Sequence, residues 1–183
     1  YRHNKTLWSK TDMSNLRLIK ETSATSVSTL ELQDVFSDDF DIYKFYTYYQ
    51  SSAEEEQDIR LLNSSGSAIT SDYDYAMVVL QAATSFSELR ATNQTFFRVI
   101  NKNENNYGGV AIGYIFNPTS TSSYTFLLSQ CSHNYDLGGT SNVYEGFKNI
   151  GVLKQTTKVT GLQLINNTTA DCELKIYGLR VDT

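Results

Sequence analysis

The closing segment of the chain constrains its fold more than any other stretch. From Cys172 to Val181 apolar and polar residues alternate, in the order Cys-Glu-Leu-Lys-Ile-Tyr-Gly-Leu-Arg-Val. A period of two places successive side chains on opposite faces of a β-strand, one face buried and the other in water. Residues 26–36 alternate in the same way, and the pattern resumes over residues 40–49. The sequence therefore predicts an all-β chain whose first and last strands pair within the sheet.

Turn-forming residues divide the rest of the chain into further short strands. Asn63-Ser-Ser-Gly and Asn105-Asn-Tyr-Gly-Gly are typical of tight turns, because Gly and Asn adopt positive φ at low steric cost. A single helical turn is predicted near residues 85–89. The predicted strands cover residues 27–36, 41–49, 58–63, 76–81, 95–100, 110–116, 124–131, 143–149, 159–165 and 172–181. Strands at such short intervals predict one antiparallel β-sandwich of jelly-roll type over residues 16–183.

The predicted sandwich has a core and a separate N-terminal arm. Residues 1–15 are polar apart from Leu7, Trp8 and Met13, and are interpreted as an extended arm or as a lead-in from an upstream segment. The predicted core consists of Leu30, Leu32, Val35, Ile42, Leu61, Val78, Leu80, Val99, Ile112, Phe126, Leu128, Leu162, Leu174 and Ile176.

Charge and hydropathy argue against two classes of partner. The net charge is −5 and only 19% of the residues are charged, whereas nucleic acids and anionic membrane surfaces attract basic proteins. No apolar run approaches the ~18 residues of a membrane-spanning helix. The sequence therefore predicts neither nucleic-acid binding nor membrane insertion.

Aromatic residues supply the candidate contact site. The chain has 13 Tyr and 9 Phe but a single Trp. In the strand 41–49, Ile42, Lys44, Tyr46 and Tyr48 share one face, and the remaining residues share the other. One interpretation is a central strand with one face in the core; the other is an aromatic surface for a partner subunit or a sugar, since tyrosine offers a flat apolar ring and a hydroxyl. The candidate contact residues are Trp8, Tyr46, Tyr48, Tyr49, Tyr107 and Tyr135.

Neither a metal nor a cofactor is predicted. Cys131, His133 and Asp136 are the one tempting group of ligands, and three donors are too few for a closed zinc site. Cys131 and Cys172 are interpreted as buried reduced thiols, with a single cross-strand disulfide left open.

The acidic residues are predicted to serve the loops. Asp38, Asp39 and Asp41 form one group and Asp72 and Asp74 another, and neither has the spacing of a calcium loop. Loop solvation and turn capping are the expected roles of these residues. The charged run 54–58 is interpreted as a solvated hairpin.

Catalytic motifs are absent from the sequence. It contains no Gly-x-Ser-x-Gly elbow, phosphate-binding loop or dinucleotide fingerprint. We therefore expect a protein without enzymatic activity and without catalytic residues.

Several segments, taken in order, resemble a family of β-sandwich proteins from tailed bacteriophages, especially marine and cyanobacterial ones. The segments are residues 26–44, 59–66, 73–76, 114–118, 123–126 and 175–179. The resemblance implies a virion structural protein: a tail-fibre or receptor-binding domain that contacts host-surface glycans, or a head-decoration protein on the capsid. The aromatic residues on both faces of strand 41–49 and the polar arm with Trp8 predict a homo-oligomer. The resemblance implies that it is a trimer and that it associates with other virion proteins. A free carbohydrate-binding module is the alternative outside a virus.

Overall fold

The computed structural model describes residues 15–40, 42–53, 55–82, 86–103, 107–136 and 142–180. These residues contain strands and turns but no helix, so the predicted all-β class is confirmed. The strands, in chain order, are β1 (Leu16–Leu32), β2 (Ile42–Gln50), β3 (Glu55–Asn63), β4 (Tyr73–Gln81), β5 (Ser87–Gln94), β6 (Phe97–Asn103), β7 (Gly109–Phe116), β8 (Thr125–Asp136), β9 (Asn142–Leu153) and β10 (Val159–Leu179).

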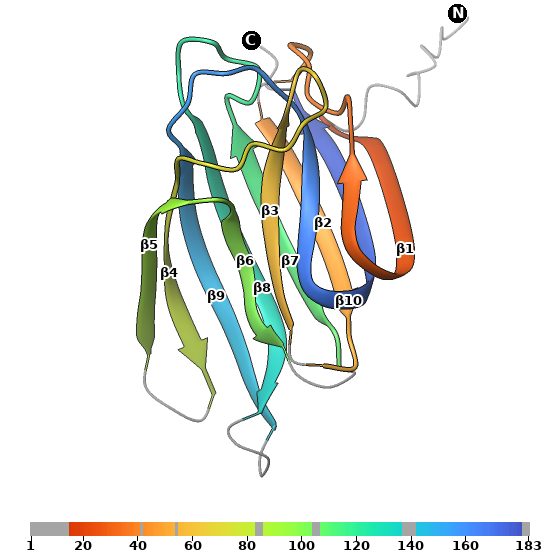
Figure 1. Cartoon of the computed structure of the whole chain (residues 1–183), viewed down its shortest axis with the longest axis vertical. Coiled ribbons are helices and arrows are strands. Elements are labelled where there is room, and N and C mark those ends of the chain that lie inside the picture. The colour runs from red at the N-terminus through yellow and green to blue at the C-terminus, as the bar shows by residue number, and fades with distance from the viewer. Residues whose placement is uncertain are drawn as a thin grey trace, which may run out of the picture.

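All ten strands belong to one antiparallel sheet that folds over on itself (Figure 1). Its hydrogen-bonded order is β5-β4-β9-β8-β7-β2-β10-β3-β6, with β1 also paired to β10. The strand β6 ends this order, yet it packs over the inner face of β8 and β9. There Asn149 donates to the carbonyl oxygens of Arg98 and Val99 at 3.2 and 3.3 Å. The two ends of the sheet therefore enclose one core.

The long ribbon of β1 and β10 causes this folding-over. Strand β1 follows one edge of β10 from Leu16, opposite Leu179, to Leu32, opposite Leu162. The other edge of β10 pairs with β2 over residues 171–179 and with β3 over residues 159–166. Because β10 is continuous, its two halves carry β2 and β3 into the two facing portions of the sheet. The terminal strands do pair, as the sequence predicted.

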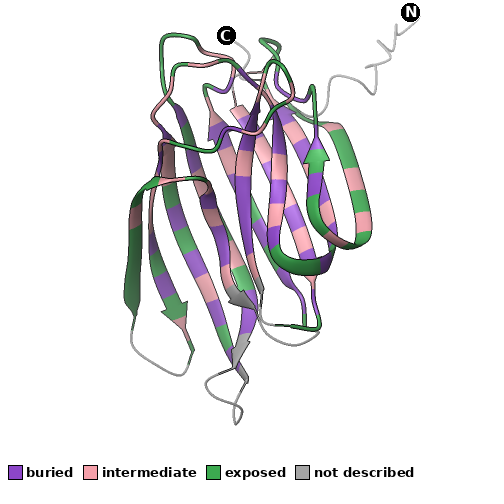
Figure 2. Cartoon of the chain, viewed as in Figure 1, coloured by how far each residue is buried: buried purple, intermediate pink, exposed green. Residues whose placement is uncertain are grey.

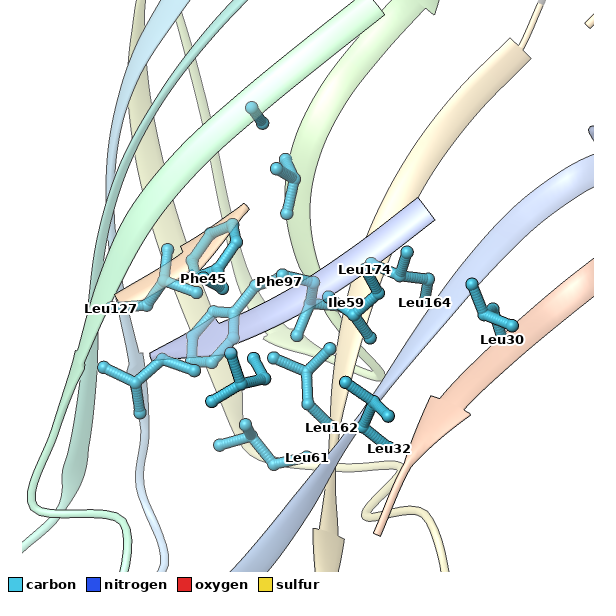
Figure 3. Packing of buried hydrophobic residues seen from close by; sticks show 14 of the residues in the cluster. Leu30, Leu32, Phe45, Ile59, Leu61, Phe97, Leu127, Leu162, Leu164 and Leu174 are labelled. Atoms are coloured by element: carbon cyan, nitrogen blue, oxygen red, sulfur yellow. The ribbon is translucent and has the colours of Figure 1, made fainter. Parts of the chain in front are cut away.

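Strands alternate buried and less buried residues along their length, as the coloured bands in Figure 2 show. In β2 every second residue is buried, from Tyr43 to Tyr49. Inward side chains from both portions of the sheet meet in one apolar cluster, part of which Figure 3 shows. Of the predicted core, Leu30, Leu32, Val35, Leu61, Val99, Leu162, Leu174 and Ile176 are buried.

Six predicted core residues do not lie in the core. Val78, Leu80, Ile112 and Phe126 are exposed, and Ile42 and Leu128 are half-buried. They occupy the outer face of the sheet, because large rings already fill the space inside. A Cβ at Gly113, for example, would lie 2.4 Å from Cε1 of Phe45. The small residues Gly109, Ala111 and Gly113 of β7 therefore point inward together with Ile115, and Val110 and Ile112 point outward.

Three predictions of local structure are also wrong. The helical turn near residues 85–89 is replaced by edge strand β5, which hydrogen-bonds to β4. The charged run 54–58 is not a solvated hairpin: β3 begins at Glu55, and Gln57 and Asp58 are buried. The predicted strands 159–165 and 172–181 are one strand, because pairing with β1 continues across the residues between them.

Membrane-spanning helices are lacking in the described ranges of the chain. The predicted arm, residues 1–15, falls outside those ranges except for Asn15.

Candidate ligand-binding groove

A groove of about 320 Å³ lies on the outer face of the sheet, where β2 ends and β7 begins. Tyr48 comes from β2, Tyr107 precedes β7, and Tyr144 comes from β9. Tyr107 and Tyr144 are 63% and 75% exposed, so their rings are available to a ligand. The groove is lined by Tyr48, Tyr107, Gly108, Gly109, Val110, Ser132, His133, Asn134 and Tyr144.

The floor of the groove depends on a glycine. Gly108 has a φ of +69°, which residues other than glycine seldom adopt. A Cβ at this position would also lie 3.0 Å from Cε2 and 3.1 Å from Oη of Tyr48. The hydroxyl of Tyr48 donates to Oε1 of Gln50 at 2.8 Å. The Tyr48 ring is therefore held against the backbone in one orientation.

The lining of the groove carries aromatic rings and neutral polar groups. Ser132, Asn134 and His133 add a hydroxyl, an amide and an imidazole, and among the residues that the structure describes neither a carboxylate nor an ammonium or guanidinium group lines the groove. Flat rings beside neutral donors and acceptors suit a ligand with apolar faces and hydroxyl edges, such as a neutral sugar.

The predicted contact residues divide among three places. Tyr48 and Tyr107 meet in the groove, and Tyr46 lies on the same face of β2 with the ammonium group of Lys175 at 5.8 Å from its ring centre. Tyr49 is fully buried, so its ring does not contact a partner at the surface. Trp8 and the side chain of Tyr135 lie outside the described residues.

Sequence reasoning missed Tyr144. The alternation around it could have revealed it, because Val143 and Phe147 point inward and so place Tyr144 on the outer face. The interpretation of residues 41–49 as a central strand with one face in the core is confirmed, and Tyr43 is a core residue whose hydroxyl donates to the Ser37 carbonyl at 2.6 Å. Tyr48 lines the groove, and its contact with a partner or a sugar stays a prediction.

A second group of functional side chains lies on the inner face behind the groove. Cys131 and His133 share a strand face, as expected, and Sγ lies 3.9 Å from Nδ1. Nε2 of His133 lies 3.4 Å from Oε1 of Glu145, and Gln81 donates to the other carboxylate oxygen. The imidazole also stacks on Phe147, with ring centres 5.3 Å apart. No local sequence pattern indicates that Glu145 belongs to this group, because the pairing of β8 with β9 places it opposite His133.

This inner group resembles a Cys-His-Glu arrangement, but it lacks the properties of a nucleophilic site. Burial raises the pKa of the Cys131 thiol to about 12, so the reactive thiolate is disfavoured. The His133 and Glu145 side chains are almost completely buried. No group of three or more His, Cys, Asp or Glu side chains suited to a metal occurs among the described residues. The side chain of Asp136 lies outside the described residues. The group is best explained as a buried polar contact within the fold.

The acidic loop residues act largely as the sequence predicted. Hydrogen bonds from Gln155 and Ser71 lower the pKa of Asp72, and the Asn93 amide and Lys154 lower that of Asp74. Asp39 accepts a hydrogen bond from the Ser37 hydroxyl. These contacts fix turns, whereas Asp41 lies outside the described residues.

Comparison with known proteins adds little. No family model matches the chain, and no curated protein matches it. Among solved structures it is similar to a chain from infectious bursal disease virus Gx strain, at 8% identity and a TM-score of 0.15 over 91% of this chain. A VP2 subviral particle of the same virus gives 6% identity and a TM-score of 0.15 over 90%. This protein spans about two fifths of those chains, 42% and 41%. Structural similarities this weak support no inference about the fold or the function of the protein.

Proposed function

We propose that this protein is a non-enzymatic virion structural protein of a tailed bacteriophage, and that it binds a host-surface glycan in the groove of Tyr48, Tyr107 and Tyr144. The observation that carries the proposal is the convergence of three tyrosines from separate parts of the chain on one groove, beside the hydroxyl of Ser132 and the amide of Asn134. The resemblance of its segments to phage β-sandwich proteins supplies the biological setting. Glycan adhesion favours a place in the phage tail, as a tail fibre or receptor-binding protein.

The jelly-roll sandwich remains the proposed subclass of the fold. Its support is the ribbon of β1 and β10, which pairs along nearly its whole length and bends between the two facing portions of the sheet. An experimental structure that instead showed a single, open sheet would exclude this subclass.

Head decoration is a second candidate function, and one observation favours it. The outer face of the sheet carries exposed apolar residues, including Ile112, Phe126 and Ile150, which suit permanent contact with other virion proteins. Copy number per particle separates the two functions. Hundreds of copies would indicate the capsid, and a few to a few dozen would indicate the tail.

Glycan binding is tested with the purified chain and glycans released from host cell surfaces. We expect Tyr144→Ala and Tyr107→Ala each to weaken binding by about tenfold, which corresponds to roughly 1.4 kcal/mol for one lost aromatic contact. Tyr124→Ala is the matched control, because Tyr124 is similarly exposed but does not line the groove.

Two results would overturn the proposal. The first is glycan binding that both groove variants retain in full, or that the wild-type chain lacks altogether. The second is release of cleaved glycan by the wild-type chain, which would make the protein an enzyme. A free carbohydrate-binding module would bind glycan and yet be missing from purified virions.

A further inference from the structure

The outer face of the sheet carries a second, apolar surface that adjoins the tyrosine groove. Six large apolar residues on β4, β7, β8 and β9 are each between 39% and 60% exposed. We call them the outer patch: Val78, Leu80, Val110, Ile112, Phe126 and Ile150.

Strand pairing places Ile150 and Phe126 of the outer patch in two apolar rows, whereas Lys148 and Gln130 lie between Val78 and Ile112. Ile150 lies opposite Leu128, which lies opposite Tyr114 on β7. Val152 and Phe116 flank Phe126 in the neighbouring row. A hollow of about 560 Å³, lined mainly by apolar atoms of β4, β7, β8 and β9, runs over this part of the face. An antiparallel sheet ordinarily has one polar face in contact with water. Apolar rows on the outer face therefore indicate that another surface covers this face as well.

The size of the outer patch matches a protein interface. Its six side chains expose on the order of 500 Å², which is already at the scale of the largest apolar patches on monomers. Half-buried neighbours such as Leu128, Tyr114 and Phe116 extend it toward the ~800 Å² that each partner buries in a standard interface.

The charges around the patch indicate which partner covers it. Glu88 and Arg90 on β5 lie opposite Val78 and Ala76 at the edge of the patch, whereas Lys148 on β9 lies inside it, between Val78 and Gln130 of β8. The rim therefore carries both signs of charge. An isologous contact requires this, because the same surface meets itself and a rim of one sign would repel its copy.

We infer that the outer patch of one chain packs against the outer patch of a second copy of the same chain. The contact joins copies in pairs and does not depend on the glycan proposal. The groove lies at the end of the patch, since Val110 belongs to both, and a pair of chains therefore carries two grooves. Two linked weak sites bind a glycan-coated surface far more tightly than one, because the second binding event is intramolecular.

The test is the solution mass of the full chain by light scattering at micromolar concentration. We expect twice the 20.7 kDa of one chain for the wild type, and the mass of one chain for Ile150→Glu and for Val78→Lys. The two substitutions introduce opposite charges. If both variants are monomers, the loss of the dimer is due to the lost apolar contact and not to repulsion by one sign of charge. Both sites are about half exposed, and far-UV circular dichroism checks that the variants keep the fold.

Leu89→Glu is the matched control, because Leu89 is 40% exposed on the opposite face of the sheet, across from buried Met77. It is expected to keep the wild-type mass. A monomeric wild type overturns the inference, and a monomer that binds neutral-lipid vesicles assigns the patch to lipid instead. A trimer whose mass survives Ile150→Glu also overturns it, while supporting the threefold assembly that the phage resemblance implies.

Discussion

Asp58 is a buried carboxyl group on β3, with 4% of its surface exposed. Burial raises its pKa to about 8, and the attraction of Arg98, whose Nε lies 2.8 Å away, offsets only part of that cost. Arg98 also pairs with Glu56 and lies over the ring of Phe96. The folded chain therefore binds a proton at Asp58 that the unfolded chain, with a pKa of about 4, releases in mildly acidic solution.

A pH-dependent stability follows from Asp58. Because its pKa is higher in the folded chain, its stabilising contribution is complete below pH ~4 and is lost as the pH rises toward 8. We expect the free energy of unfolding to fall by a few kcal/mol between pH 5 and pH 8.5. In Asp58→Asn, which cannot ionise, the fall should be clearly smaller. Urea denaturation at both pH values measures this, and equal falls in the two proteins would contradict it.

The Cys131 thiol gives a second prediction at the scale of single residues. Both cysteines are free, and Cys172 accepts hydrogen bonds from Asn166 and Gln57 in the core. With its pKa raised to about 12 by burial, Cys131 is expected to react with a thiol reagent at least tenfold more slowly than an unfolded cysteine. In denaturant, both thiols should react at the rate of an unfolded cysteine. Fast reaction of the native chain would show that Cys131 is accessible as a thiolate.

The ribbon of β1 and β10 is the element that organises the fold, and it bends at Ser26. The register between these strands shifts between Ala24 and Val27, and Ser26 has a φ of +53°. Its amide donates to Oδ1 of Asp171 at 2.9 Å, so the bend is held across the ribbon. A positive φ here lets β1 follow β10 from one portion of the sheet into the other.

Substitution at Ser26 tests whether this bend is strained. Ser26→Gly should raise the free energy of unfolding by up to about 1 kcal/mol, because glycine adopts positive φ without a steric penalty. Ser26→Val should lower it by about 1–2 kcal/mol, since a β-branched residue resists that conformation. Chemical denaturation of both variants measures the difference. Equal stability would mean that the bend does not depend on the φ of this residue.

At the scale of the whole molecule, one apolar cluster joins both portions of the sheet. It includes Leu30 of β1, Phe97 of β6 and Leu127 of β8, so the portions are expected to lose structure together. Pairing of Leu16 with Leu179 brings the two ends of the described chain into contact. Such non-local pairing costs chain entropy before it gains contacts, and it slows folding.

We therefore expect one unfolding transition that is the same by tyrosine fluorescence and by far-UV circular dichroism. Refolding should take milliseconds to seconds or longer, as in other proteins dominated by distant strand pairs. Two separated transitions would show that the portions of the sheet are independent. A circular dichroism spectrum with more than about a quarter helix would contradict the fold class itself.

The sequence by itself determined the all-β class, the pairing of the terminal strands, and the alternation of strand 41–49. These follow from local patterns: a period of two in β2 and β10, and Gly or Asn at turns such as Gly66, whose φ is +77°. The same period of two places Tyr46 and Tyr48 on one face of β2. The sequence also predicts Tyr48 and Tyr107 as contact residues, and both line the groove.

Tertiary structure alone decided which face of β4, β7 and β8 is buried. Val78 and Val79 are neighbours of the same chemistry, and only pairing with β9 and packing under β6 assign Val79 to the core and Val78 to the surface. The same holds for Glu145 beside His133 and for buried Asp58. Alternating side chains divide a strand into two faces. Where both faces carry apolar residues, the volume that side chains from distant strands leave free decides which face is buried.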